Sequence, residues 1–177
     1  MFKTIARFFR HLISNPWQVK HHFSEQALQN IEAAITESEA KHTGEIRFVV
    51  ELGLHPFEIL SKKSPRVRAI ELFSHLNIWD TERNNGVLIY LLLADRDVEI
   101  VADRGIDKPV GYDRWDVICH GIEVLFRRGE FEAGVLQGIA EVNKALEAHF
   151  PVKSIKNKRK RSVQRKKNEL PDKPLIL

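Results

Sequence analysis

The chain has 177 residues, enough for one ordinary domain with a sizeable core, and it carries a formal net charge of +4 at pH 7. Residues 1–22 and 151–177 hold the positive excess, whereas residues 23–150 have a net charge of −8. An acidic central part argues against a nucleic-acid-binding domain and is compatible with a cation site.

The first segment, residues 2–13, has the pattern of an amphipathic helix closed by Pro16. Its apolar side chains recur at helical spacing, namely Phe2, Ile5, Phe9 and Leu12. Two interpretations are open. Residues 1–15 lie on an anionic membrane surface, or the helix packs its apolar stripe on the domain.

The same segment is a poor secretory signal, because Lys3, Arg7 and Arg10 interrupt the apolar stretch that such a signal needs. The apolar run Val87–Leu93 is far short of the ~20 residues that span a bilayer. Cys119 is the only cysteine, so no intramolecular disulfide can form and a reducing compartment is expected. We therefore expect a cytoplasmic protein, either free or peripheral on the inner membrane.

A helix, a strand and a second helix are predicted in the next part of the chain. Ser24 can cap a helix that ends near Thr43-Gly44, and residues 46–52 form the first strand. After a looser stretch bracketed by two prolines, a second helix presents one apolar face, formed by Val67, Ile70, Phe73 and Leu76.

Two further strands are predicted back to back. Asn84-Asn85-Gly86 opens the apolar run Val87–Leu93, and a second apolar stretch, Val98–Ala102, follows Asp95-Arg96-Asp97. Because only a two-residue turn is available at Asp95-Arg96 or its neighbours, the two strands form an antiparallel hairpin.

The Asp-x-Asp sequence superficially resembles the nucleophile motif of haloacid-dehalogenase-type phosphatases. The chain re-enters a strand at once, so we interpret this sequence as a turn with solvated charges.

Two more helices complete the predicted order α-β-α-β-β-α-α. The first carries Trp115, Ile118, Ile122 and Leu125 at helical spacing, and the second runs from Phe131 to Leu146. The first two strands are joined through a helix and should therefore be parallel, with a right-handed connection. The fold class is α/β, with a parallel β-α-β unit and an antiparallel hairpin in one mixed sheet.

Polar and acidic side chains gather where these strands begin and end. In the predicted topology they share one edge of the sheet or fold over it, and they are Glu45, Asn84, Asn85, Asp103, Asp107 and Asp113. Oxygen ligands of this kind suit calcium and magnesium, and a divalent ion would remove the repulsion among clustered carboxylates. The sequence predicts a Ca²⁺ or Mg²⁺ site at this edge. The alternative is helix capping by Asp113 and turn formation by the Asn pair.

The last segment, residues 152–177, is strongly basic and is predicted to be a disordered tail, since it cannot bury enough apolar surface to order itself. Three roles are open: a solvated tail, contact of residues 153–167 with an anionic membrane, or non-specific electrostatic binding of nucleic acid. No aromatic residue follows Pro151, so stacking on bases and specific nucleic-acid recognition are not expected.

Several short motifs resemble the TPM domain family in order and spacing. They are Thr43-Gly44-Glu45-Ile46, Asn85-Gly86-Val87-Leu88, Asp95-Arg96, Gly105-Ile106, Phe126-Arg127-x-Gly129-x-Phe131 and Gly134-x3-Gly138-Ile139. The resemblance covers residues 23–151, which separates a basic amphipathic segment (1–22) and the basic tail from a TPM-like domain. It implies a three-layer α/β/α sandwich, with helices on both faces of the sheet.

The resemblance leaves two functions open. Some family members are described as thylakoid acid phosphatases, others bind calcium, and one group serves photosystem II repair. The first interpretation is an accessory or interaction protein with a cation-binding edge, at the membrane surface, with an unknown protein partner. The second is a weak metal-dependent acid phosphatase, in which a metal-activated water attacks a phosphate held by the cation and Arg104. The familiar catalytic signatures, such as Gly-x-Ser-x-Gly or Cys-x5-Arg, are missing from the sequence.

Overall fold

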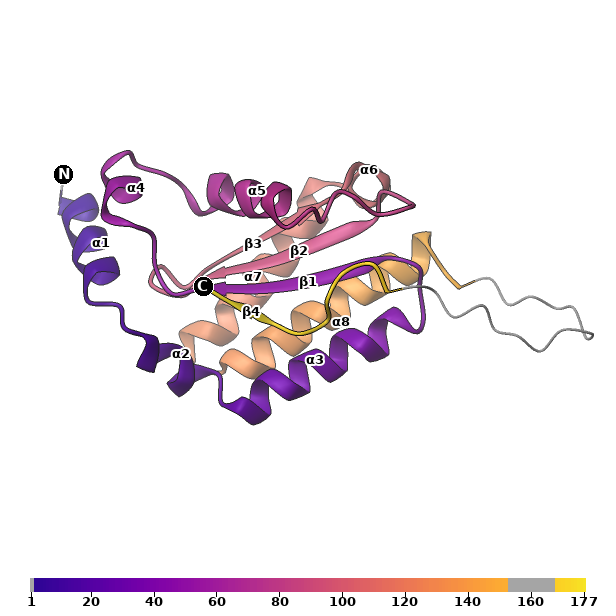
Figure 1. Ribbon diagram of the computed structural model, residues 1–177, viewed down its shortest axis with the longest axis horizontal. Helices are drawn as coiled ribbons and strands as arrows, with labels where there is room; N and C mark the ends of the chain where they lie inside the picture. Colours follow the sequence, from indigo (N-terminus) through magenta and orange to yellow (C-terminus); the bar gives the residue numbers. More distant parts are fainter. Residues whose placement is uncertain (1, 153–167) are drawn as a thin grey trace, which may run out of the picture.

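The computed structural model describes residues 2–152 and 168–177 and is built around a sheet with the strand order β3-β2-β1-β4 (Figure 1). The strands are β1 Glu45–Glu51, β2 Gly86–Leu92, β3 Asp97–Ala102 and β4 Leu175–Ile176. β1 and β2 pair in parallel, and β2 and β3 pair antiparallel. The predicted mixed sheet is confirmed.

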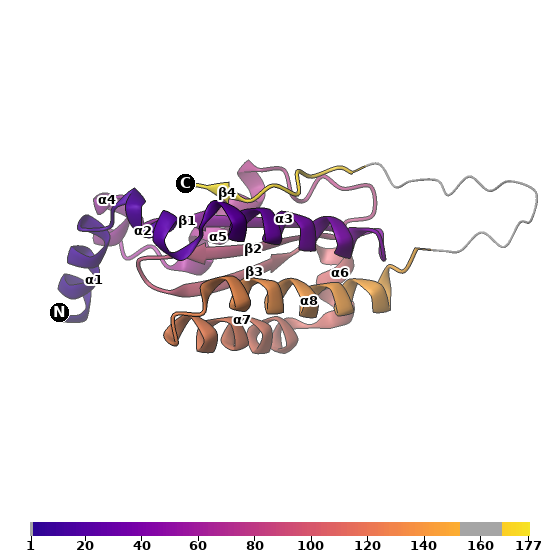
Figure 2. The ribbon, with the colours of Figure 1, turned by 90° about the horizontal axis from the view of Figure 1, so that it is seen from below.

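Helices cover both faces of this sheet. They are α1 Phe2–Leu12, α2 Pro16–His22, α3 Glu25–Glu39, α4 Pro56–Leu60, α5 Pro65–His75, α6 Arg104–Val110, α7 Tyr112–Arg127 and α8 Phe131–His149. Figures 1 and 2 show α3, α7 and α8 together on one face and α5 on the other. The three-layer α/β/α sandwich is confirmed.

Two apolar cores, one on each face of the sheet, bury β1 and β2. All seven residues of each strand are buried, because neighbouring side chains point to opposite, equally covered faces. Phe48 and Ile89 belong to the core beneath α3, α7 and α8. Val49 and Leu88 belong to the smaller core that contains Ala69 and Leu72 of α5.

Three local predictions need correction. Pro16 does not only close the first helix. It begins α2, whose N-terminus is capped by the Asn15 side chain accepting a hydrogen bond from the Trp17 amide (2.6 Å). The short helices α4 and α6 were not predicted. Between β2 and β3, the four residues 93–96 form the turn in place of two.

The end of the chain returns to the domain. Residues 175–176 pair in parallel with β1, and Leu177 exchanges hydrogen bonds with Val50 and Leu52 (2.9 and 3.1 Å). Arg47 donates to the Pro171 carbonyl at 2.6 Å. The predicted disordered tail is therefore wrong for residues 168–177, whereas residues 153–167 lie outside the described residues.

Two glycines of the sequence motifs allow close backbone approach. A Cβ at Gly86 would lie 2.1 Å from the carbonyl oxygen of Ile78, and one at Gly105 would lie 2.3 Å from that of Asn84. Neither carbonyl can move without shifting the backbone that carries it. These contacts hold the loop before β2 against the start of β2 and the start of α6.

We expect Gly86→Ala to destabilise the fold by about 1–3 kcal/mol, because the added methyl group overpacks against the backbone. Gly121→Ala is the matched control. Gly121 lies in α7, and a Cβ there would meet only the flexible end of the Gln137 side chain, at 3.3 Å. In a helix interior, alanine is more favourable than glycine by up to about 1 kcal/mol. Urea unfolding of both variants checks this prediction, and equal stability of the two would contradict it.

Candidate functional site

The starts of β1 and β2 and the end of β3 lie side by side, since Glu45 is in register with Gly86, and Val87 with Ala102. At this edge Glu45, Asn85 and Asp103 are all buried. Asn84 supplies the turn, with a φ of 52°, and its carbonyl accepts a hydrogen bond from the Gly105 amide (2.9 Å).

Two of the carboxylates predicted for this edge accept hydrogen bonds from neighbouring groups, and a third is exposed. Asp103 caps α6 by accepting from the Arg104 amide (2.7 Å), and Asp107 accepts from the indole nitrogen of Trp115 (3.0 Å). Asp113 is exposed and does not cap α7, whose N-cap is Gly111. Within residues 2–152 and 168–177, no group of three or more His, Cys, Asp and Glu side chains is arranged to hold a metal ion.

Unsatisfied polar atoms nevertheless remain at this edge. Asn85 is 0% exposed, its side-chain oxygen and nitrogen have no hydrogen-bond partner, and Oδ2 of Asp103 is buried in the same condition. Glu45 accepts a hydrogen bond from the Leu170 amide (3.3 Å), so the C-terminal segment closes over it. Leaving buried polar groups without partners costs free energy. The oxygen atoms of Asn85 and Asp103 are the hard donors that a small cation prefers, but two donors are fewer than the roughly six to eight ligands of Ca²⁺.

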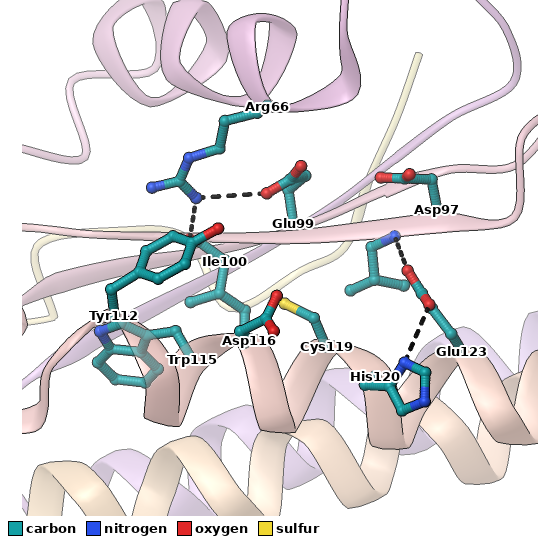
Figure 3. A pocket seen from close by; sticks show the side chains of 11 residues that line it. Arg66, Asp97, Glu99, Ile100, Tyr112, Trp115, Asp116, Cys119, His120 and Glu123 are labelled. Carbon is teal, nitrogen blue, oxygen red and sulfur yellow. Dashed lines mark hydrogen bonds and ion pairs between the residues drawn. The ribbon is translucent and has the colours of Figure 1, made fainter.

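A second site, which the sequence analysis missed, is a pocket of about 200 Å³ between β3 and α7 (Figure 3). Four carboxylates line it, two from β3 and two from α7: Asp97, Glu99, Asp116 and Glu123. Arg66 of α5 reaches it and pairs with Glu99 (3.4 Å). The signal in the sequence was the i, i+2 spacing of Asp97 and Glu99, which places both on one face of a strand.

Burial sets the acid–base properties of this pocket. It raises the pKa of Asp97 to about 7, with further contributions from the negative charges of Glu99 and Glu123. Burial also raises the pKa of the Cys119 thiol to about 12, so this side chain is a protonated, unreactive thiol at neutral pH. The pocket thus holds a carboxyl group that titrates near neutrality, next to a thiol that cannot serve as a nucleophile.

The N-terminal helix attaches to the domain through its polar face. Asp95, in the turn after β2, accepts hydrogen bonds from Arg7 (2.8 Å) and Arg10 (3.0 Å), and His11 Nε2 lies 3.2 Å from it. Nδ1 of His11 accepts from the Leu54 amide (2.9 Å). Burial opposes ionisation of Asp95, but the hydrogen bonds from His11 and Arg7 outweigh it and lower its pKa. The prediction of a turn with solvated charges is wrong for Asp95, which is only 10% exposed.

Phe8 of α1 packs against the smaller core, but the apolar stripe predicted for this helix points away from the domain. Ile5, Phe9 and Leu12 are 49, 56 and 57% exposed, so the interpretation in which this stripe packs on the domain is wrong for these three residues. Figures 1 and 2 show α1, α2 and α4 together at one end of the molecule. We name the exposed side chains of this end the N-terminal apolar surface: Ile5, Phe9, Leu12, Ile13, Trp17, Phe57 and Leu60. Across the described part of the chain, no helix has the length and apolarity needed to cross a membrane.

Comparison with known proteins identifies this architecture. The family pattern described as the TPM domain matches residues 19–145. The NMR structure of BA42 protein from the psychrophilic bacterium Bizionia argentinensis is 29% identical, covers 88% of this chain and 95% of its own, and superposes with a TM-score of 0.68. The N-terminal domain of a P. gingivalis protein is 19% identical over 72% of this chain and 78% of its own, with a TM-score of 0.57, and shows the shared fold. No curated protein matches the chain.

The pocket between β3 and α7 predicts pH-dependent stability. Because the pKa of Asp97 is raised to about 7, folding favours the protonated carboxyl, and this contribution is lost as the pH rises from the ordinary value near 4 towards 7. Relative to Asp97→Asn, the wild type should lose about 1–2 kcal/mol across that range, allowing for solvent screening. Chemical denaturation at a series of pH values measures this. The exposed Asp113→Asn variant should follow the wild type, and parallel profiles for wild type and Asp97→Asn would contradict the prediction.

Proposed function

This chain belongs to the TPM domain family, and we propose that it is an accessory domain which attaches to an anionic membrane surface through its N-terminal apolar surface. The observation that carries the proposal is the orientation of α1. Its polar side chains are used to hold the helix on the domain, so its apolar stripe is available to a partner. An amphipathic helix lies in a bilayer interface with this face inserted.

The charge around this surface favours an anionic bilayer over an apolar protein groove. Residues 5–23 contain no Asp or Glu, and among them Arg10 and Lys20 are exposed. Basic side chains near an anionic leaflet contribute about 1 kcal/mol each. Residues 23–150 are acidic, so the negative potential of an anionic bilayer attracts the α1 end and repels the rest of the domain. This orients the domain with α1 towards the lipid.

The expected attachment is weak and reversible. Ile5, Phe9 and Leu12 are about half exposed, so each gains only part of the about 1.5–3 kcal/mol that full burial of such a side chain provides. Stable peripheral binding normally needs two signals. Contact of residues 153–167 with an anionic membrane, one of the three roles left open by the sequence, would supply the second signal, and these residues lie outside the described residues.

The test is co-sedimentation of the full chain with vesicles. Leu12→Ser should weaken binding to anionic vesicles about fivefold, since about 1 kcal/mol of apolar transfer is lost. The control Val117→Ser removes an apolar side chain of similar exposure, 60% against 57%, from α7. Trp17, which is 71% exposed, reports insertion through a blue shift of its fluorescence. The proposal fails if the wild type does not sediment with anionic vesicles, or if both variants bind as the wild type does.

A second candidate function is cation binding at the edge formed by Glu45, Asn85 and Asp103. It is supported by the unpartnered buried oxygens of Asn85 and Asp103. The acid phosphatase alternative has weaker support. It needs a bound metal ion to activate water, and Asp107, one of the predicted ligands, is already bound by the Trp115 indole.

Titration with Ca²⁺ and Mg²⁺ tests this candidate. We expect amide shifts confined to residues 84–86 and 103–107 and a rise in melting temperature that Asn85→Leu abolishes, because the substitution removes an oxygen ligand at a buried position. Asp113→Asn is the matched control, since that exposed carboxylate lies outside the cluster and its loss should leave the response unchanged. A flat titration of the wild type would exclude the cation site.

A further inference from the structure

A cavity of about 320 Å³ lies where the α1–α2 connection meets the turn between β2 and β3. The polar groups that line it include Arg10 of α1, Gln18 and His22 of α2, and Asp95 and Arg96 of the turn. Ile13 lines it as well and is 69% exposed. The cavity therefore opens beside the N-terminal apolar surface.

The charge balance of the cavity is positive. Its carboxylate, Asp95, already receives hydrogen bonds from Arg7 and Arg10 and lies against His11. The side chain of Arg10 is 56% exposed, and Arg96 is exposed at the tip of the turn, with a φ of 53°. Two guanidinium groups, those of Arg10 and Arg96, line the cavity with one carboxylate, which leaves an excess of positive charge facing the cavity.

His22 gives this cavity a titratable donor. Its ring stacks on Phe131 at 4.0 Å between centroids and lies 5.2 Å from the ring of His21. Burial lowers the pKa of His22, and the neighbouring His21 and Arg96 lower it further. An anion that enters the cavity favours the charged form of His22 and therefore raises its pKa.

We propose that this cavity binds the phosphate group of an anionic phospholipid headgroup through Arg10, Arg96 and His22. Guanidinium groups pair with phosphate oxygens in a planar, charge-assisted geometry, and imidazole donates a further hydrogen bond. The position beside Ile13 places a phosphate next to the side chains that enter the bilayer. The assignment of the phosphate to a lipid rests on the proposed membrane attachment. The binding of a phosphate group by the cavity does not.

One arm of the experiment uses a soluble phosphate. The full chain is titrated with glycerol 3-phosphate, against sodium chloride of equal ionic strength, while the ring resonances of His22 are followed by NMR. We expect the pKa of His22 to rise towards its ordinary value as the anion binds, and Arg96→Gln to weaken this response about tenfold by removing a charge-assisted hydrogen bond. Arg128→Gln is the control, since it removes the same charge from an exposed position at the end of α7.

The other arm compares vesicles of equal surface charge that contain phosphatidic acid or phosphatidylglycerol. We expect the wild type to prefer phosphatidic acid, whose phosphomonoester is accessible to the guanidinium groups, and expect Arg96→Gln but not Arg128→Gln to lose the preference.

Vesicle binding without lipid preference, together with an unchanged His22, would overturn the proposal and leave the membrane attachment standing. A response of His22 to glycerol 3-phosphate without any vesicle binding would overturn the lipid assignment and the membrane attachment together, and would mark the cavity as a site for a soluble phosphate ester.

Discussion

The burial of β1 and β2 on both faces is the constraint from which the rest of this structure follows. Their side chains fill two apolar cores, so polar groups can enter the sheet only where a partner satisfies them. Tyr90 shows the requirement: its hydroxyl donates to Glu51 at 2.6 Å, and Arg68 pairs with the same carboxylate at 2.7 Å. Chemistry is therefore confined to the margins of the sheet. The edge with Asn85 and Asp103, the open side of β3 and the turn that carries Asp95 are three such margins.

The sequence predicted the elements that depend on local pattern. Apolar stretches, continuous in β2 and interrupted by Arg47 in β1 and by Glu99 in β3, identified the three strands, and helical spacing identified α3, α5, α7 and α8. It failed where the deciding partner is distant in the chain. Helical periodicity shows that α1 has two faces but not which one meets the domain, and that choice depends on Asp95, 88 residues beyond Arg7. Likewise β4 consists of two residues, and its pairing with β1 depends on an edge strand formed more than 120 residues earlier.

The candidate site was predictable to a similar extent. The topology correctly brings Glu45, Asn85 and Asp103 to one edge, because strand order and direction determine that placement. Which of the carboxylates are available to bind a cation depends on their side-chain partners, and no local sequence pattern predicts those partners. Asp107 is engaged by Trp115 from the following helix, and Asp103 divides its two oxygens between a helix cap and a buried position without a partner. The pocket of Asp97 was missed for the same reason, since its raised pKa depends on burial against α7 as well as on its own strand.

The two proposed activities of the N-terminal region depend on one carboxylate. Asp95 determines that α1 meets the domain with its polar face, and by neutralising part of the charge of Arg7 and Arg10 it makes that attachment compatible with burial. Arg10 also lines the cavity, where its side chain is more than half exposed. A phosphate that recruits Arg10 therefore weakens only one of the contacts to Asp95, because Arg7 and His11 remain in place. In the proposed function, the same ion-pair cluster holds the helix to the domain and leaves Arg10 free to bind an anion beside it.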